Sequence, residues 1–186
     1  MIGYAFCGSF CTIERSLSEL KNLADSGHEI LPIMSERVYN TDTRFFVAEE
    51  LHRRVRVICG RDIIHTVEAA EPIGPKLVLS SLIVAPCTGN TLAKIASGIT
   101  DSAVTMAIKA HLRCDRPTLI ALASNDAMSQ NLANIGAILN RKSVYMVPMK
   151  QDDPKKKPHS LVADFDKLIE AYELMQKGVQ LRPLFL

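Results

Sequence analysis

The sequence predicts a single three-layer α/β/α domain of the Rossmann or flavodoxin-like type, with a mostly parallel sheet of about six strands. Short apolar segments rich in β-branched residues alternate along the chain with longer segments whose apolar residues recur at helical spacing. Residues 83–85 and 119–122 are apolar without polar alternation, which is typical of strands covered on both faces. Such alternation of strands and helices builds a parallel sheet with right-handed crossovers.

The elements follow from these patterns in chain order. The first helix is the clearest, because Ile13, Leu17, Leu20 and Leu23 lie on one helical face and Gly27 suits its C-terminal end. Strands are expected at residues 2–6, 29–33, 55–59, 81–85, 118–123 and 143–147. Further helices are expected at residues 91–96, 103–112, 127–139 and 161–175. Within the single domain 1–186, we expect residues 149–160 to form a loop or lid and residues 161–177 a C-terminal helix.

Composition narrows the classes of function. The chain has 186 residues, and 22 Lys and Arg against 20 Asp and Glu give a net charge of +2. This balance lacks the basic excess of a nucleic-acid or membrane surface. With no Trp and 5% aromatic residues, stacking platforms for single strands are not expected either. No apolar run approaches the ~20 residues of a membrane helix, and the N-terminus lacks the basic region of a signal peptide. We expect neither nucleic acid nor membrane as a partner.

Cysteine and histidine usage favours a reduced compartment without a metal site. The five cysteines are dispersed and form no Cys-x-x-Cys pair, and the five histidines are scattered. No zinc spacing is present. We therefore expect a cytoplasmic chain with no bound metal.

Ligands of open α/β sheets bind beyond the carboxyl ends of the strands. Gly8 and Ser9 follow the first strand, where small residues and hydroxyls at a helix N-terminus suit an anion. The dinucleotide and P-loop fingerprints are absent, so a mononucleotide phosphate is favoured, although a plain turn with a helix cap explains this loop equally well. Ser35 follows the second strand and either caps a helix or donates to the same phosphate.

Residues 85–102 are the most informative stretch of the chain. Pro86 is expected to end a buried strand because it has no N–H to donate. Gly89 permits close backbone approach to a flat ligand, and Asn90 offers both a donor and an acceptor to a heterocycle edge. The alternative is that Asn90 or Thr91 caps the helix that follows.

This stretch resembles the flavin-binding loop of the homo-oligomeric flavin-containing cysteine decarboxylase superfamily. That loop typically reads Pro-Ala-Ser-Ala-Asn-Thr and is followed by Lys-Ile/Leu-Ala-x-Gly-Ile-x-Asp. The chain departs at Cys87, Thr88 and Gly89, which all have small side chains. The matching positions are Pro86, Asn90, Thr91, Lys94, Ala96, Gly98 and Asp101.

Two further positions support the resemblance. The superfamily motif Pro-x-Met-Asn-x-x-Met-Trp is matched in part by residues 122–129, where Asn125 and Met128 agree while the Pro, the first Met and the Trp are replaced. His65 stands where the superfamily commonly has its active-site His. From the residues alone, Asn125 could instead cap the helix after it, and His65 could be a structural histidine.

Within the superfamily the chain is most similar to the subfamily of dipicolinate synthase B chains, with which it shares residues 8–14, 40–45, 71–76, 88–90, 124–127 and 151–158. The resemblance implies FMN as cofactor and catalytic roles for His65 and Asn125. The cofactor-binding residues that it implies are Gly8, Ser9, Ser35, Pro86, Thr88, Gly89, Asn90, Thr91, Ser102 and Met128.

The resemblance also implies a reaction. A dihydrodipicolinate-type intermediate of the lysine pathway would lose two hydrogens to form dipicolinate during sporulation, in the mother-cell cytoplasm of a spore-forming bacterium. Flavin suits this step because its N5 accepts hydride while a group such as His65 takes the proton. An A chain would be the partner, with NAD(P) entering only through it, and the B chain would form a homo-oligomer built on trimers.

Two alternatives remain open at this point. The chain could be an FMN-binding or scaffolding subunit without redox chemistry of its own, or a flavin-dependent decarboxylase of the same superfamily. Replacement of the motif's Pro by Leu122 and of its Trp by Ser129 disfavours cysteine decarboxylation. The run 155–157, which is Lys-Lys-Lys, is either a solvated loop or a source of positive charge near a dicarboxylate substrate.

Overall fold

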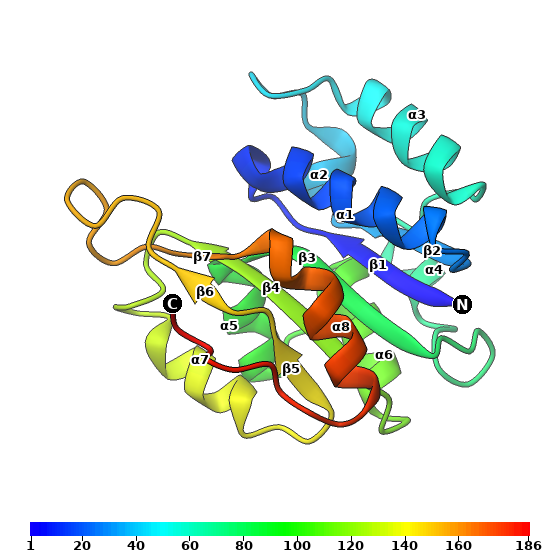
Figure 1. The fold of residues 1–186 in the computed structure, drawn as a ribbon. Helices are drawn as coiled ribbons and strands as arrows, with labels where there is room; N and C mark the ends of the chain where they lie inside the picture. Colours follow the sequence, from blue (N-terminus) through cyan, green and yellow to red (C-terminus); the bar gives the residue numbers. More distant parts are fainter.

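The computed structural model describes all residues 1–186 and contains a seven-stranded sheet in the order β2-β1-β3-β4-β7-β6, with β5 also paired to β4 (Figure 1). Every pairing is parallel except those of β7, which runs against β4 and β6. The predicted mostly parallel α/β sheet is therefore confirmed. The strands are β1 (Ile2–Phe6), β2 (Ile30–Met34), β3 (Ser81–Thr88), β4 (Thr118–Ser124), β5 (Val144–Met146), β6 (Met149–Lys150) and β7 (Leu161–Ala163).

Helices cover both faces of this sheet, which gives the predicted three layers (Figure 1). The α-helices are α1 (Ile13–Asp25), α2 (Glu36–Asn40), α3 (Ala48–Cys59), α4 (Val67–Ala70), α5 (Gly89–Ser97), α6 (Ala103–Leu112), α7 (Leu132–Leu139) and α8 (Leu168–Gln176). Two 3-10 helices, η1 (Phe10–Thr12) and η2 (Phe165–Lys167), precede α1 and α8. None of the helices has the length and apolar character that a membrane span needs.

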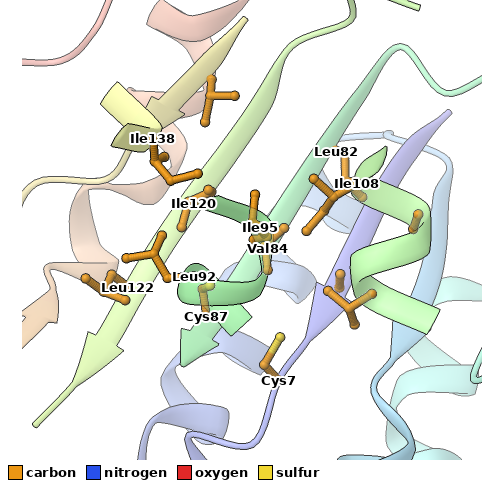
Figure 2. Packing of buried hydrophobic residues seen from close by; sticks show 14 of the residues in the cluster. Cys7, Leu82, Val84, Cys87, Leu92, Ile95, Ile108, Ile120, Leu122 and Ile138 are labelled. Atoms are coloured by element: carbon orange, nitrogen blue, oxygen red, sulfur yellow. The ribbon is translucent and has the colours of Figure 1, made fainter. Parts of the chain in front are cut away.

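Alternating side chains of the strands divide the core into two layers. Tyr4 and Phe6 of β1 face α1 and α8, where they pack in one cluster with Leu17 and Leu168. On the other face, Val84 of β3 and Ile120 of β4 point toward α5, α6 and α7 (Figure 2). Leu92, Ile95, Ile108 and Ile138 are the helix residues labelled in that layer. Because both faces of β3 and β4 are buried, the central residues of both strands are apolar without polar alternation.

The strand predicted at residues 55–59 is wrong. These residues form the end of helix α3, in which Leu51, His52 and Val55 are buried while the arginines face outward. Val55 belongs to the buried helical face that begins at Ala48, whereas Val57 is 72% exposed. Gly60 ends the helix with φ of 62°. The sheet is extended beside β2 only by an isolated bridge between Ile33 and Ile64.

Residues 161–177 are not one helix as predicted. Residues 161–163 form β7, which pairs antiparallel with Ala123 and Ser124 at the end of β4, and α8 begins only at Leu168. In this short segment burial alternates, with Leu161 and Ala163 buried and Val162 half-buried, and three residues are too few to reveal such a period in the sequence. The loop predicted at 149–160 begins with strand β6 and is otherwise irregular.

Two other predicted boundaries also differ. Pro86 does not end its strand: β3 continues to Thr88, and a register shift between Val84 and Cys87 accommodates the missing N–H. Helix α7 begins at Leu132 rather than residue 127, so Asn125 caps no helix. Turns occupy the intervening residues, held by backbone bonds from Ser129 and Asn131 to the Asp126 carbonyl.

Candidate functional site

Hydroxyl side chains meet where strands β1, β2 and β3 end, and they line a cavity of about 430 Å³. We call it the Ser35 cavity. Each of Ser35, Thr88 and Ser102 is the N-cap of a helix, so the helices α2, α5 and α6 all begin here. No hydrophobic residue lines this cavity, and helix N-termini that meet at a polar cavity suit a phosphate or another anion. Its lining residues are Gly8, Ser35, Glu36, Arg37, Thr88, Asn90, Thr91, Lys94, Asp101 and Ser102.

Ser35 and Arg37 keep hydrogen-bond donors free toward this cavity. The Ser35 hydroxyl oxygen accepts the cap bond from the Val38 backbone N–H at 3.4 Å, and its own O–H has no acceptor within the chain. The guanidinium of Arg37 has no carboxylate partner and no hydrogen bond. Ser35 can therefore cap α2 through its hydroxyl oxygen and at the same time donate its O–H to a ligand, so the two alternatives predicted for it are compatible.

The other charged side chains of the Ser35 cavity are paired. Lys94 donates to both carboxylate oxygens of Asp101, at 2.9 and 2.7 Å, and this contact lowers the pKa of Asp101. The Glu36 carboxylate accepts the Ala103 backbone N–H at 3.0 Å, which joins α2 to the first turn of α6. Arg37 is therefore the one cation of the cavity that is free for an anionic ligand.

A second cavity, of about 620 Å³, adjoins the first, and both are lined by Gly8 and Thr88. We call it the Arg44 cavity. It differs in character because Phe10, Phe45, Ala123 and Val162 add apolar surface. The Arg44 guanidinium lies 4.8 Å from the centre of the Phe45 ring. The remaining lining residues are Ser9, Cys11, Thr12, Gly89, Ser124, Asn125, Asp126, Asp152 and Lys157.

A compact polar network forms one wall of the Arg44 cavity. The Asp126 carboxylate accepts hydrogen bonds from the Ser124 hydroxyl and from the Asn131 amide. These bonds, that from Ser124 first, lower the pKa of Asp126. The network lies directly against Gly89, where an added Cβ would be only 2.6 Å from Asn131 Nδ2 and 2.9 Å from Asp126 Oδ1. An Ala at this position, as in the superfamily motif, would force at least one of the Ser124, Asp126 and Asn131 side chains to move.

Most of the sequence-predicted site residues meet at the two cavities. Gly8, Ser35, Thr88, Asn90, Thr91 and Ser102 line the Ser35 cavity, and Gly8, Ser9, Thr88, Gly89 and Asn125 line the Arg44 cavity. Three residues line neither. Pro86 is buried, with its carbonyl accepting the Cys7 N–H at 3.0 Å. Met128 is half-buried against the core, and His65 lies in an aromatic stack. The helix cap near Asn90 is Thr88 rather than Asn90 or Thr91.

His65 stacks on Tyr39, with ring centres 3.7 Å apart and ring planes 5° from parallel. The buried ring of His52 stacks on Tyr39 as well, at 4.0 Å. His65 Nδ1 lies 3.2 Å from the Ile63 carbonyl oxygen, and Nε2 has no partner in the chain. With a proton on Nδ1 donated to that carbonyl, Nε2 is a free acceptor. Tyr39 belongs to α2, the helix that Ser35 caps, so α2 links His65 to the Ser35 cavity.

Several lining residues were not singled out from the sequence. Arg37 lies outside the matched segments, and Arg44 lies in the shared segment 40–45 but was assigned no role there. Both arginines lack an acidic partner, which only the structure reveals. Asp126 stands beside Asn125 in the partly matched motif, so its position was available from the sequence but its contacts were not. The Gly89 departure from the usual Ala was the one local signal that the neighbouring side chains are unusual.

A parallel α/β sheet with polar, hydroxyl-lined and aromatic-walled cavities at the carboxyl ends of its strands defines a flavodoxin-like ligand-binding fold. The chain belongs to the Flavoprotein family, whose model matches residues 1–171. It is 37% identical over 183 residues to the dipicolinate synthase B chain of Bacillus subtilis (strain 168), and the match covers 98% of this chain and 92% of that protein. The sequence-based resemblance to these B chains is thereby confirmed.

Solved structures agree with this assignment. The crystal structure of the dipicolinate synthase B chain from Bacillus halodurans C matches with a TM-score of 0.91 and 35% identity, over 100% of this chain and 95% of that one. A dodecameric FMN-dependent UbiX-like decarboxylase from Escherichia coli O157:H7 matches with a TM-score of 0.65 and 22% identity, over 96% and 95%. The second likeness shows the shared fold.

Proposed function

We propose that this chain is the flavin-binding component of a dipicolinate synthase, in which a dihydropyridine dicarboxylate is oxidised to pyridine-2,6-dicarboxylate. One observation carries the proposal: a polar cavity with an unpaired arginine adjoins an aromatic-walled cavity with a second arginine, in a chain 37% identical to a dipicolinate synthase B chain. The proposed partner is an A chain, and NAD(P) would enter the reaction only through that chain. The proposed location is the mother-cell cytoplasm.

The residues of the two cavities fit FMN. The Ser35 O–H and the Arg37 guanidinium are free donors for the FMN phosphate. The absence of hydrophobic lining suits this phosphate and the polar ribityl chain that carries it. Phe10, Phe45 and Val162 offer the apolar surface that a flat ring requires. Thr88 and Gly89, at the boundary of the cavities, and Asn90 next to them would contact the polar middle of the molecule.

When bound, FMN would supply a two-electron acceptor for the hydride that leaves the dihydropyridine ring. The chain's own residues bind the substrate, orient it and take up its proton. Arg44 attracts a substrate carboxylate into the second cavity, and the Asn125 amide can orient it. His65 lines neither cavity of its own chain. Its proposed role as proton acceptor rests on the superfamily resemblance and on its free Nε2, with Tyr39 fixing its ring.

The binding part of the proposal is tested by titrating the full chain with FMN and following flavin fluorescence. Arg37→Gln removes a charge-assisted hydrogen bond worth about 1.5–3 kcal/mol, so affinity should fall roughly 10–100-fold. Arg15→Gln is the matched control, because Arg15 is exposed on α1 and lines neither cavity. Equal affinity of the two variants would overturn the phosphate assignment.

The catalytic part is tested with His65→Asn in the reconstituted complex of the A and B chains. Loss of a general base typically costs about 10²–10⁴-fold in rate, so turnover should fall at least about tenfold. FMN affinity and the thermal midpoint should change little, because the half-exposed ring fills no apolar cavity. Normal turnover, or a large loss of thermal stability, would contradict the assignment.

The second candidate function, an FMN-binding or scaffolding subunit without redox chemistry, predicts different results for these variants. FMN would bind through Ser35 and Arg37 as above, but neither His65→Asn nor changes at Asn125 would lower the turnover of the complex. The turnover of the complex that contains His65→Asn therefore separates the candidates.

A further inference from the structure

We propose that Asp126 is a specificity-determining residue that accepts a hydrogen bond from a ring N–H of the ligand in the Arg44 cavity. The inference rests on the proposed function, because it concerns the dicarboxylate that this cavity would hold. It assigns the cavity a preference for a cyclic dicarboxylate whose ring nitrogen carries hydrogen over the aromatic pyridine product.

Asp126 is held in one orientation by its neighbours. Its Oδ1 accepts from the Ser124 hydroxyl, and the Asn131 amide nitrogen donates to Oδ1 and Oδ2, both at 2.9 Å. Asn131 is 4% exposed, and its carbonyl oxygen accepts from the Asn134 amide at 2.9 Å. That last bond turns the Asn131 NH₂ group toward Asp126. The carboxylate is therefore positioned before any ligand arrives.

The network offers the cavity an acceptor and no donor. The Ser124 O–H and the Asn131 N–H groups are already directed at Asp126, whereas a carboxylate has about four lone-pair sites. Asp126 lines the cavity, so its remaining lone pair is available to a ligand. Its hydrogen bonds favour the charged form and lower its pKa, so it is an anion at neutral pH. It accepts a hydrogen bond there rather than supplying a proton.

The cavity also contains one cation without an acidic partner. Lys157 donates to Asp152 at 2.6 Å and is neutralised by it, whereas Arg44 forms no ion pair and lies over the Phe45 ring. A ligand that binds both the Arg44 guanidinium and the Asp126 carboxylate needs a carboxylate for Arg44 and an N–H or O–H donor for Asp126. A nitrogen ring with carboxylates on the carbons beside the nitrogen presents these groups side by side.

Oxidation to the pyridine would change this match. The dihydropyridine ring in its N–H form donates to Asp126, but the aromatic product has only a nitrogen lone pair at that position. Two acceptors that face each other repel, and a site built around a donor rejects ligands that lack it. Asp126 would therefore retain the substrate and favour release of the product.

The test compares two stable compounds by isothermal titration calorimetry on the full chain in the presence of FMN. Piperidine-2,6-dicarboxylate carries hydrogen on its ring nitrogen, which is an ammonium group at neutral pH, and pyridine-2,6-dicarboxylate has only a lone pair there. We expect the wild-type chain to bind the piperidine compound at least about tenfold more tightly. In Asp126→Ala, which leaves no acceptor at this position, the two affinities should agree within about threefold. Asp126→Ser serves the same purpose if loss of the carboxylate disturbs the network.

Asp153→Asn is the matched control, because it removes the same charge from a residue that lines neither cavity; it should keep the wild-type preference. Equal binding of both compounds by the wild-type chain, or a preference that persists in both Asp126 variants, would overturn the role of Asp126 alone. Binding of neither compound would overturn the dicarboxylate function itself, and with it this inference.

Discussion

Replacement of Gly89 by alanine is predicted to destabilise the fold because of the side chains that lie against Gly89. An added Cβ would lie 2.6 Å from Asn131 Nδ2 and 2.9 Å from Asp126 Oδ1, and would also overlap the Ser124 hydroxyl. These groups are fixed by hydrogen bonds to one another, so they cannot move aside at low cost. Overpacking of this kind costs about 1–3 kcal/mol, while the better helix propensity of Ala returns at most about 1 kcal/mol.

We expect Gly89→Ala to lower the free energy of unfolding by about 1–2 kcal/mol, measured by denaturant titration. For a chain of this length the thermal midpoint should fall by roughly 2–4 °C per kcal/mol. Gly136→Ala in α7 is the matched control: nothing lies within 4 Å of its added Cβ, so Ala should stabilise the helix by up to about 1 kcal/mol.

Ser124→Ala provides the second half of the experiment. It removes the hydroxyl that the new methyl group would overlap, so Gly89→Ala should cost less in the Ser124→Ala background by at least about 0.5 kcal/mol. If Gly89→Ala is as stabilising as Gly136→Ala, the proposed packing of α5 against this network is refuted. Strictly additive effects of the two substitutions would refute the specific contact with Ser124.

Three other properties of the protein can be tested separately. Burial lowers the pKa of His111, so the unfolded chain binds a proton at this residue more readily and the free energy of unfolding falls as the pH drops below about 6.5. His111→Gln should reduce this decline in unfolding experiments from about pH 7.5 to pH 5.5. An unchanged decline would contradict the role of His111. Tyr39→Leu should lower turnover of the A–B complex about tenfold while Tyr39→Phe, which keeps the stack on His65, should not. Light scattering should give the mass of a trimer or a multiple of it, and a monomer across the micromolar range would contradict this.

The sequence predicted the sheet well where strands are covered on both faces. Continuous apolar runs such as 119–122 have no other common explanation within an alternating chain. Residues 55–59 were mistaken for a strand because a short apolar run rich in β-branched residues is typical of strands, although only Val55 lies on the buried face of the helix and Val57 is 72% exposed. Strand β7 was missed since its partner is the end of β4, and nothing local to residues 161–163 specifies that contact.

The candidate site was predictable only in part, for a similar reason. Ser35 and Thr88 could be placed because hydroxyls that follow strands are local signals. The importance of Arg37 and Arg44 depends on the absence of acidic partners, which is a property of the folded chain. Asp126 likewise owes its fixed orientation to the hydrogen bond from Asn131. The two residues are joined by a turn, whereas the sequence had predicted that the helix begins at residue 127.

The most direct test of the central claim is the absorbance of the FMN-loaded chain, recorded before and after anaerobic addition of the dihydropyridine dicarboxylate. We predict that the absorbance band of oxidised flavin bleaches as pyridine-2,6-dicarboxylate accumulates, and that His65→Asn slows this bleaching at least about tenfold. A flavin spectrum that stays oxidised while the A–B complex converts the same substrate would contradict the claim.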